Sequence, residues 1–123
     1  MTLQESGEMY LETIYVLTMQ GKSIRAIDVC EHMGYSKPSV SRAVNLLKKG
    51  GYLTVEEGGS LKLTEKGKQR AENTYQRHTV LTEFFTLLGV DKTVASDDAC
   101  RIEHHISDQT VQALKKHVQA LKK

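Results

Sequence analysis

The six residues 100–105, CRIEHH, combine a thiol, a carboxylate and two imidazoles. Soft sulfur, carboxylate oxygen and imidazole nitrogen are the side-chain chemistries that bind transition metals. If a helix covers 93–105, then Cys100, Glu103 and His104 stand at positions i, i+3 and i+4 and share one face, whereas His105 points away. The segment therefore predicts a metal site on one helix face.

Three donors are too few to close a site for most metals, so further ligands must come from elsewhere in the chain. His78 lies within a long predicted helix, and Met9 and Glu12 stand three residues apart in the first one. Taken alone, Met9 is better explained as a core methionine and His78 as a surface or packed histidine. Cys30 belongs to an apolar stripe and is expected to be structural. The candidate metal ligands are Met9, Glu12, His78, Cys100, Glu103 and His104.

The composition is that of one ordinary domain, or of a small domain with an appended interaction segment: 123 residues, 39% hydrophobic and 26% charged. No apolar run is long enough to cross a bilayer, and the N-terminal residues lack the features of a secretion signal. Two cysteines do not make a disulfide framework. We expect a cytoplasmic protein with reduced thiols and no membrane partner.

Positive charge is concentrated in the middle third of the chain. Residues 36–70 carry 8 basic and 3 acidic side chains, whereas residues 1–35 carry 2 basic and 5 acidic ones. A basic stretch in a chain whose net charge is only +2 is typical of a surface that binds a polyanion.

The same stretch predicts a helix-turn-helix. Ile24, Ile27, Cys30 and Met33 form an apolar stripe on a short helix, and a glycine turn follows it. In the next helix, 36–49, the apolar residues Val40, Ala43, Val44 and Leu47 follow the i, i+3, i+4, i+7 pattern and face inward, and the opposite face is small, polar and basic. Serines there allow close approach to a duplex, and an arginine can pair with guanine. The candidate DNA-binding residues are Ser36, Lys37, Pro38, Ser39, Ser41, Arg42 and Lys48, with Lys62 in the segment that follows.

Residues 52–64 read as two short alternating runs around a Gly-Gly turn, which predicts a β-hairpin directly after the recognition helix, a wing. A long helix then runs from a Thr64 cap to Gly89, and two helices at about 93–105 and 107–121 complete the chain. The apolar second half of the long helix favours a subunit interface. We predict a mainly α protein: a winged helix-turn-helix domain at 1–70, followed by an all-helical dimerisation and metal-binding domain at 71–123.

At this point the chain resembles the diphtheria-toxin-repressor family of metal-dependent transcriptional repressors, over residues 5 to the end. The resemblance rests on EMYLETIY at 8–15, SKPSVSRAVNLLKKGGYL at 36–53, LTEKGK at 63–68, RHTVLTEFF at 77–85 and DDACRIEHHIS at 97–107. It implies a winged helix for double-stranded DNA, a homodimer formed by the helical region, and an ion that spans both. The chain resembles the short form, which lacks an SH3-like C-terminal domain.

The resemblance also implies roles for the candidate ligands. Met9, Cys100, Glu103 and His104 match the primary metal site of the iron-responsive branch, whereas Glu12 and His78 match ligands of the manganese-responsive branch. The iron branch has a carboxylate and a histidine where this chain has Thr82 and Ser96, so its ancillary site is incomplete here. Some relatives present an arginine near the wing tip, where this chain has glycines and leaves Lys62 to serve.

The softness of the donors helps to choose the metal. A thioether and a thiolate suit Fe(II) better than Mn(II), which prefers hard oxygen ligands. We therefore expect Fe(II) as the corepressor, with Mn(II) as the alternative, and with Co(II), Ni(II) or Zn(II) as substitutes in vitro. The function predicted is a repressor of metal-uptake genes that has no small organic substrate.

Two rival functions follow from the same residues. CRIEH is a cysteine-substituted version of the H-x-x-E-H motif of zinc hydrolases, but there the glutamate must activate water, and the sequence offers no second catalytic cluster. Alternatively, the chain is a winged-helix regulator that responds to a non-metal signal or to oxidation of the Cys100 thiol. Operator binding that does not depend on metal would favour the second rival.

Overall fold

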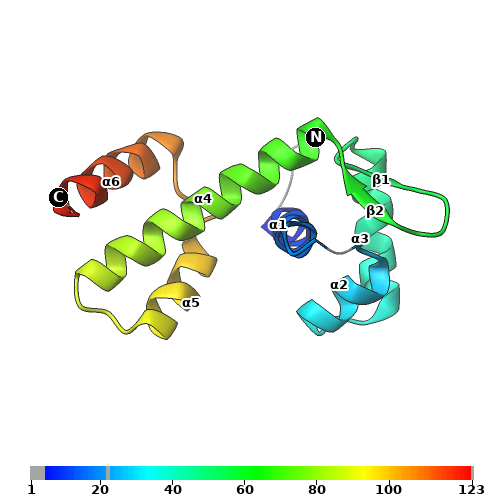
Figure 1. Ribbon diagram of the computed structural model, residues 1–123, viewed down its shortest axis with the longest axis horizontal. Helices are drawn as coiled ribbons and strands as arrows, with labels where there is room; N and C mark the ends of the chain where they lie inside the picture. Colours follow the sequence, from blue (N-terminus) through cyan, green and yellow to red (C-terminus); the bar gives the residue numbers. More distant parts are fainter. Residues whose placement is uncertain (1–4, 22, 123) are drawn as a thin grey trace. The chain divides into compact units, whose positions relative to one another are not determined.

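The computed structural model describes residues 5–21 and 23–122 of the chain. In this part of the chain the elements are α1 (Glu5–Met19), α2 (Ala26–Met33), α3 (Lys37–Lys49), β1 (Leu53–Val55), β2 (Leu61–Leu63), α4 (Glu65–Leu87), α5 (Lys92–Ile102) and α6 (Asp108–Leu121) (Figure 1). They form two compact units, Met1–Glu72 and Asn73–Lys123, and the boundary falls within α4. None of the helices described is long and apolar enough to span a bilayer.

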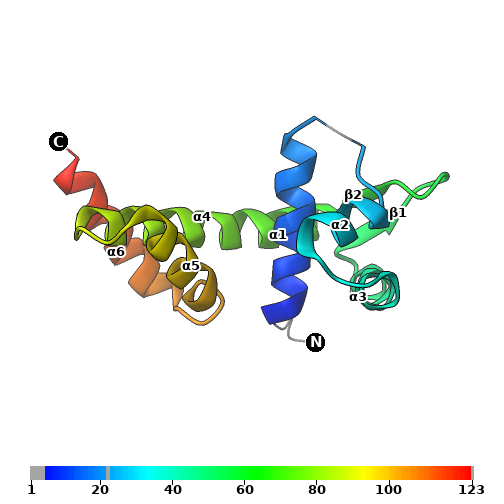
Figure 2. The same ribbon diagram turned by 90° about the horizontal axis from the view of Figure 1, so that it is seen from below.

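The first unit is a three-helix cluster with a two-stranded antiparallel sheet. Its helices α1, α2 and α3 pack against one another, and β2 also contacts α1 (Figure 2). The core is almost entirely apolar, and Leu11, Ile14, Val29 and Val40 are completely buried. Tyr10 closes this core, and burial raises the pKa of its hydroxyl above the ordinary value of 10.0.

Helix α2 begins later than its apolar stripe suggested. Ile24 precedes the helix and is buried in extended chain, where its carbonyl accepts a hydrogen bond of 2.7 Å from the Leu61 amide. Because the helix begins at Ala26, its inward face holds Val29 and Cys30, whereas Ile27 is exposed. The predicted stripe was therefore wrong at Ile27. The glycine turn is confirmed, since Gly34 has a φ of 72° and its N–H donates to the Cys30 carbonyl.

Helix α3 follows the prediction closely. The Ser36 hydroxyl accepts a hydrogen bond from the Ser39 amide, and Pro38 stands in the first turn, where a missing N–H costs nothing. Val40, Val44 and Leu47 are buried, and Ala43 packs against the same core. Apart from Leu46, which is 57% exposed, the outer face of the helix is therefore left to polar and basic side chains.

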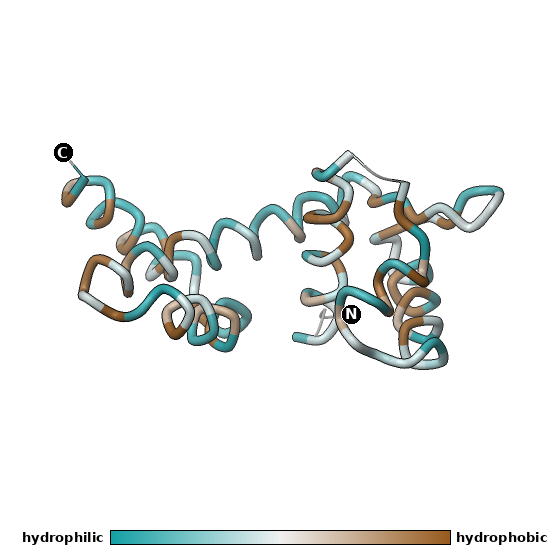
Figure 3. Tube along the Cα trace, turned by 60° about the horizontal axis from the view of Figure 1, so that its bottom comes forward, coloured by the Kyte–Doolittle hydropathy of each residue, from teal (hydrophilic) through white to brown (hydrophobic). Residues whose placement is uncertain are grey.

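The predicted wing is confirmed as the hairpin of β1 and β2, in which Leu53 pairs with Leu63 and Val55 with Leu61. Gly58 and Gly59 at its tip both have a φ of 89°, a region that side chains other than glycine rarely adopt. The tip is hydrophilic, whereas its strands contribute Leu53 and Leu61 to the core (Figure 3).

Helix α4 starts against the wing. Thr64 caps it as predicted, because its hydroxyl accepts a hydrogen bond of 3.1 Å from the Gly67 amide. A Cβ at Gly67 would lie 1.9 Å from the Tyr52 carbonyl oxygen, so only glycine allows the helix to approach this backbone. The helix ends at Leu87, and Gly89 turns the chain with a φ of 97°.

The second unit consists of the rest of α4 together with α5 and α6. Its buried apolar side chains are small or few, and they comprise Val80, Leu81, Ala95, Ala99, Val111 and Val118. Leu87 and Leu88, at the end of α4, are 46% and 65% exposed, and this end of the helix is strongly hydrophobic (Figure 3). Of the apolar stretch that favoured a subunit interface, Leu87 and Leu88 are therefore exposed in the single chain, whereas Val80 and Leu81 are buried within the unit.

Helix α5 ends at Ile102, not at His105 as predicted. Glu103 keeps a helical backbone and its N–H still donates to the Ala99 carbonyl. The next hydrogen bond, from the His105 amide to the Ile102 carbonyl, spans three residues instead of the four of an α-helix. The side chain of Arg77 on α4 donates a hydrogen bond to the carbonyl of Glu103. The chain then turns into α6, which Ser107 caps by accepting a hydrogen bond from the Thr110 amide.

Candidate metal centre and nucleic-acid interface

The outer face of α3 presents the basic and polar side chains that the sequence predicted for DNA binding. Lys37, Ser41, Arg42 and Lys48 are all exposed. Ser36 and Ser39 are partly committed to the fold, because the Ser36 hydroxyl caps the helix and lies 3.0 Å from the Ser39 hydroxyl. The face therefore offers cations for phosphates along its length and small side chains near its start.

The wing carries less positive charge than the sequence suggested. Lys62 forms an ion pair with Glu56 across the hairpin, at 3.3 Å between Nζ and Oε1. Glu57 follows Glu56 at the exposed tip, so two acidic side chains outnumber the one lysine of the hairpin. Both members of the pair are largely exposed to water, and such pairs exchange partners readily.

Glu103 is the centre of a polar cluster inside the second unit. Its side chain is completely buried, and its Oε2 lies 2.8 Å from Nδ1 of His78 on α4. Its second oxygen, Oε1, accepts no hydrogen bond from any residue that the structure describes. A buried carboxylate with an oxygen left over is costly unless a cation or a proton satisfies it.

Cys100 joins this pair through one face of α5. Donor atoms of His78, Cys100 and Glu103 all lie within 4.8 Å of one another. Bonds of about 2.3 Å to sulfur and 2.1 Å to nitrogen let two donors of one ion stand up to roughly 4.4 Å apart. The three side chains therefore fit one transition-metal ion after a small side-chain adjustment.

His104 lies beside the same cluster, just past the end of α5. Its side chain is 1% exposed, and its Nε2 stands 3.4 Å from Oε1 of Glu103. His105 is exposed on the other side of the turn. Although the helix ends early, its helical backbone at Glu103 preserves the arrangement that turns His104 inward and His105 outward.

The hydroxyls of Thr82 and Ser96 both make polar contacts with His78. The Ser96 hydroxyl lies 3.4 Å from Nε2 of His78, and the Thr82 hydroxyl donates to the His78 carbonyl at 2.7 Å. Both nitrogens of the imidazole therefore have a polar neighbour. A ligand histidine whose second nitrogen is held in this way keeps a fixed tautomer and ring orientation.

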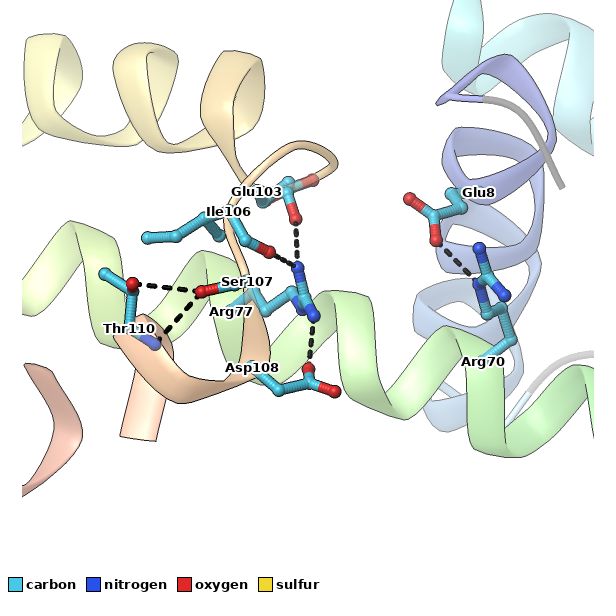
Figure 4. A network of polar contacts seen from close by, with 8 residues as sticks. All are labelled: Glu8, Arg70, Arg77, Glu103, Ile106, Ser107, Asp108 and Thr110. Atoms are coloured by element: carbon cyan, nitrogen blue, oxygen red, sulfur yellow. Dashed lines mark hydrogen bonds and ion pairs between the residues drawn. The ribbon is translucent and has the colours of Figure 1, made fainter. Parts of the chain in front are cut away.

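Met9 and Glu12 belong to α1, in the first unit, and both are half-buried. Sequence reasoning passed over their neighbour Glu8, which is buried and whose Oε2 accepts a hydrogen bond of 2.6 Å from Nε of Arg70 (Figure 4). This ion pair ties α1 to the first turns of α4 within the same unit. Glu8 stands four residues before Glu12 and so on the same helix face, and this spacing was the signal in the sequence that could have identified Glu8.

Arg77 and Asp108 are the other residues that sequence reasoning missed. Nη1 of Arg77 donates to the carbonyls of Glu103 and Ile106, and Nη2 pairs with the carboxylate of Asp108 (Figure 4). The available signals were the position of Arg77 directly before a candidate ligand and that of Asp108 directly after a capping serine.

A winged-helix unit joined to a helical unit in which a thiol and an imidazole lie beside a buried carboxylate defines a class, the DNA-binding regulators that carry a metal-sensing module. Comparison with known proteins makes this specific. Residues 2–61 match the family model described as "Iron dependent repressor, N-terminal DNA binding domain", and residues 64–123 match "Iron dependent repressor, metal binding and dimerisation domain". The chain belongs to the diphtheria-toxin-repressor family of iron-dependent repressors.

Individual relatives agree with this assignment. The chain is 34% identical over 116 residues to the HTH-type transcriptional regulator MntR of Lysinibacillus sphaericus, covering 94% of this chain and 84% of that protein. Among solved structures, it is similar to the manganese regulator SloR, with 28% identity and a TM-score of 0.82, and to the metal-dependent transcriptional regulator MtsR, with 29% identity and a TM-score of 0.81. Each match covers 97% of this chain but only 55% of the solved one.

The comparisons confirm the predicted family and the winged-helix and all-helical architecture. They also exclude the zinc-hydrolase interpretation, because the family consists of transcriptional repressors and not of enzymes.

Proposed function

We propose that this chain is a metal-dependent transcriptional repressor that binds double-stranded DNA as a homodimer in the cytoplasm. The observation that carries the proposal is the buried carboxylate of Glu103, with donor atoms of His78 and Cys100 within 4.8 Å, in the unit that matches the metal-binding and dimerisation model. DNA recognition is assigned to the exposed cationic face of α3, with Arg42 reading bases and Lys37, Lys48 and Lys62 contacting phosphates.

The proposed coordination sphere contains all six candidate ligands. Glu103, His78, Cys100 and His104 supply oxygen, nitrogen and sulfur from the helical unit, and Met9 and Glu12 of α1 complete the sphere from the winged-helix unit. These residues would hold the metal, which would supply a cross-link between the two units when bound. The ligands on α1 thereby fix the orientation of the reading unit, so that the paired α3 helices of a dimer match major grooves about 34–36 Å apart.

The proposed physiological metal is Fe(II). The thiol of Cys100 within the cluster favours a softer ion than Mn(II), whereas the similar protein SloR is a manganese regulator. With either metal, the proposed target genes are those for metal uptake, since repression in the presence of the ion would limit further import of that ion.

The decisive experiment is a DNA-binding titration under anaerobic conditions. A duplex selected from a randomised pool in the presence of Mn(II) serves as the operator, and binding is measured with Fe(II), with Mn(II) and with chelator. Metal is expected to raise the affinity about 5- to 150-fold, the range of ordinary allosteric couplings. Binding that is equally tight in chelator would contradict the proposal and support a regulator of another signal.

Two substitutions separate the roles of the units. Glu103→Ala is expected to abolish the metal response and leave weak metal-independent binding unchanged. Arg42→Ala is expected to weaken operator binding while the metal affinity of the free protein stays the same. Lys116→Ala, which removes one exposed cation from α6, is the matched control and should alter neither quantity.

A further inference from the structure

Arg77 holds the main chain of the turn that carries two of the proposed ligands. Its side chain is 13% exposed, and its Nη1 donates to the Glu103 carbonyl at 3.3 Å and also to the Ile106 carbonyl. Helix α5 has already ended at Ile102, so carbonyls in this turn lack regular helical partners. The guanidinium supplies the donors that the missing helical turn would have provided.

His78, the residue next to Arg77 on α4, contacts the side chain of Glu103. His78 Nδ1 contacts the Glu103 carboxylate at 2.8 Å, while Arg77 contacts the Glu103 carbonyl. Two consecutive residues of one helix therefore fix both the backbone and the side chain of Glu103. A displacement of α4 would move both contacts together.

The charge of Arg77 is balanced within the same network. The contacts of Arg77 are two carbonyls and the carboxylate of Asp108, at the first turn of α6, and none of them is the carboxylate of Glu103 (Figure 4). The guanidinium of Arg77 thus leaves the Glu103 carboxylate to its contact with His78. Asp108 offsets a positive charge that would otherwise stand close to an incoming metal ion.

We infer that Arg77 is a positioning residue for the metal site, which sets Glu103 and His104 by clamping the 103–106 turn, with Asp108 orienting the guanidinium. The inference rests on the proposed function, since it assigns Glu103 and His104 as ligands. A purely structural fastener between α4 and α6 would affect stability alone. A positioning residue must also affect metal affinity and the geometry of the bound ion.

The test measures Mn(II) affinity by the EPR signal of the free ion, and site geometry by the Co(II) absorption spectrum. The Arg77→Met variant is expected to bind Mn(II) about 10- to 100-fold more weakly and to shift the Co(II) bands, as loss of an outer-shell partner does elsewhere. Arg77→Lys should fall between it and the wild type, because a lysine cannot reproduce the planar fork. Asp108→Asn should weaken binding less than Arg77→Met.

Arg101→Met is the matched control, since Arg101 is 79% exposed and pairs only loosely with Asp98 at 3.9 Å. Its affinity and spectrum should equal those of the wild type. A folded Arg77→Met variant with unchanged affinity and spectrum would overturn the inference, even if its melting temperature fell. If that variant does not fold by circular dichroism, unchanged affinities in both Arg77→Lys and Asp108→Asn overturn it instead.

The same series separates this inference from the proposed function. The wild type and Glu103→Ala are titrated alongside the Arg77 variants. A wild type that binds no Mn(II) or Co(II) removes both proposals. A wild type that binds metal and loses it in Glu103→Ala, with the Arg77 and Asp108 variants unaffected, removes only the role of Arg77.

Discussion

The two units bury different chemistry at their centres. In the winged-helix unit the completely buried side chains are apolar, such as Leu11, Ile14 and Val40. In the helical unit Leu81, Ala95 and Ala99 are buried as deeply, but the completely buried side chains also include the carboxylate of Glu103, beside the 1% exposed imidazole of His104. Apolar burial stabilises a fold without any partner, whereas a buried charge needs a compensating group. The reading unit, which is the winged-helix unit, therefore has a core of ordinary apolar packing, whereas the helical unit buries a carboxylate that a bound cation would compensate.

The largest expected effect concerns the close packing of the winged-helix unit. In Gly67→Ala, the new Cβ would stand 1.9 Å from the Tyr52 carbonyl oxygen, so α4 and the wing must separate. We expect a loss of unfolding free energy at or above the roughly 1–3 kcal/mol of ordinary overpacking. Urea denaturation and hydrogen exchange resolved along the chain measure the loss and show whether it falls in residues of the first unit.

Gln69→Ala is the control for this substitution, because it changes an exposed position two residues further along the same helix. Its stability should stay within about 0.5 kcal/mol of the wild type. If Gly67→Ala behaved like this control, the tight approach of α4 to the Tyr52 backbone would be wrong.

Metal addition tests the helical unit, and it is expected to stabilise the protein instead of destabilising it. At a free Mn(II) concentration of about 100 times Kd, binding should stabilise the protein by roughly 2.7 kcal/mol. We expect slower hydrogen exchange in α5, in the turn after it and around the proposed ligands of α1, with little change in α2 and α3. The comparison between the units fails if the reading unit gains the larger protection.

Glu103→Ala supplies the control, because it removes the buried carboxylate and should cancel the metal-dependent protection. Chelator added to the wild type should reverse the protection. Stabilisation that persists in Glu103→Ala would indicate a metal bound elsewhere in the chain.

A smaller effect is expected at the start of the reading helix, where Ser36 both caps α3 and faces the candidate DNA surface. Ser36→Ala removes the cap and should cost about 1 kcal/mol of stability. Ser36→Asp keeps an acceptor for the Ser39 amide but adds a negative charge. We expect its stability to equal that of the wild type and its DNA affinity to fall below that of Ser36→Ala.

Ser36→Asp is therefore expected to be more stable than Ser36→Ala in thermal unfolding but to bind DNA more weakly. If Ser36→Asp bound DNA as tightly as the wild type, the start of α3 would not lie near phosphates. If Ser36→Ala were as stable as the wild type, the capping hydrogen bond would contribute nothing.

The reading unit was largely predictable from the sequence because its signals are local. Caps such as Ser36 and Thr64, the glycine turn at Gly34, and the 3.6-residue period of α3 each depend on residues within one or two helical turns. The error at Ile27 arose because the period alone did not fix where α2 begins, and the tertiary hydrogen bond from Leu61 to Ile24 decided it.

For the polar cluster around Glu103, the sequence predicted which residues take part but not which of them are in contact. The grouping of Cys100, Glu103 and His104 was visible as a motif, but the contact between His78 and Glu103 joins residues 25 positions apart. Likewise, the contact of Arg77 on α4 with the Glu103 carbonyl, just past the end of α5, joins residues 26 positions apart. Such contacts depend on how helices pack, which neither propensity nor spacing specifies.

The smallest expected effect concerns the wing, where Glu56 pairs with Lys62 at 3.3 Å. Glu56→Gln should change stability by less than about 0.5 kcal/mol, because the pair is exposed. It frees Lys62 and removes one negative charge, so DNA binding should tighten and its logarithmic salt dependence should steepen by about 0.9 for one added phosphate contact. Asp97→Asn, which removes an exposed charge from α5, changes the net charge equally. Only the wing variant should steepen the salt dependence, and an equal response of both variants would mean that overall charge, not Lys62, sets the DNA affinity.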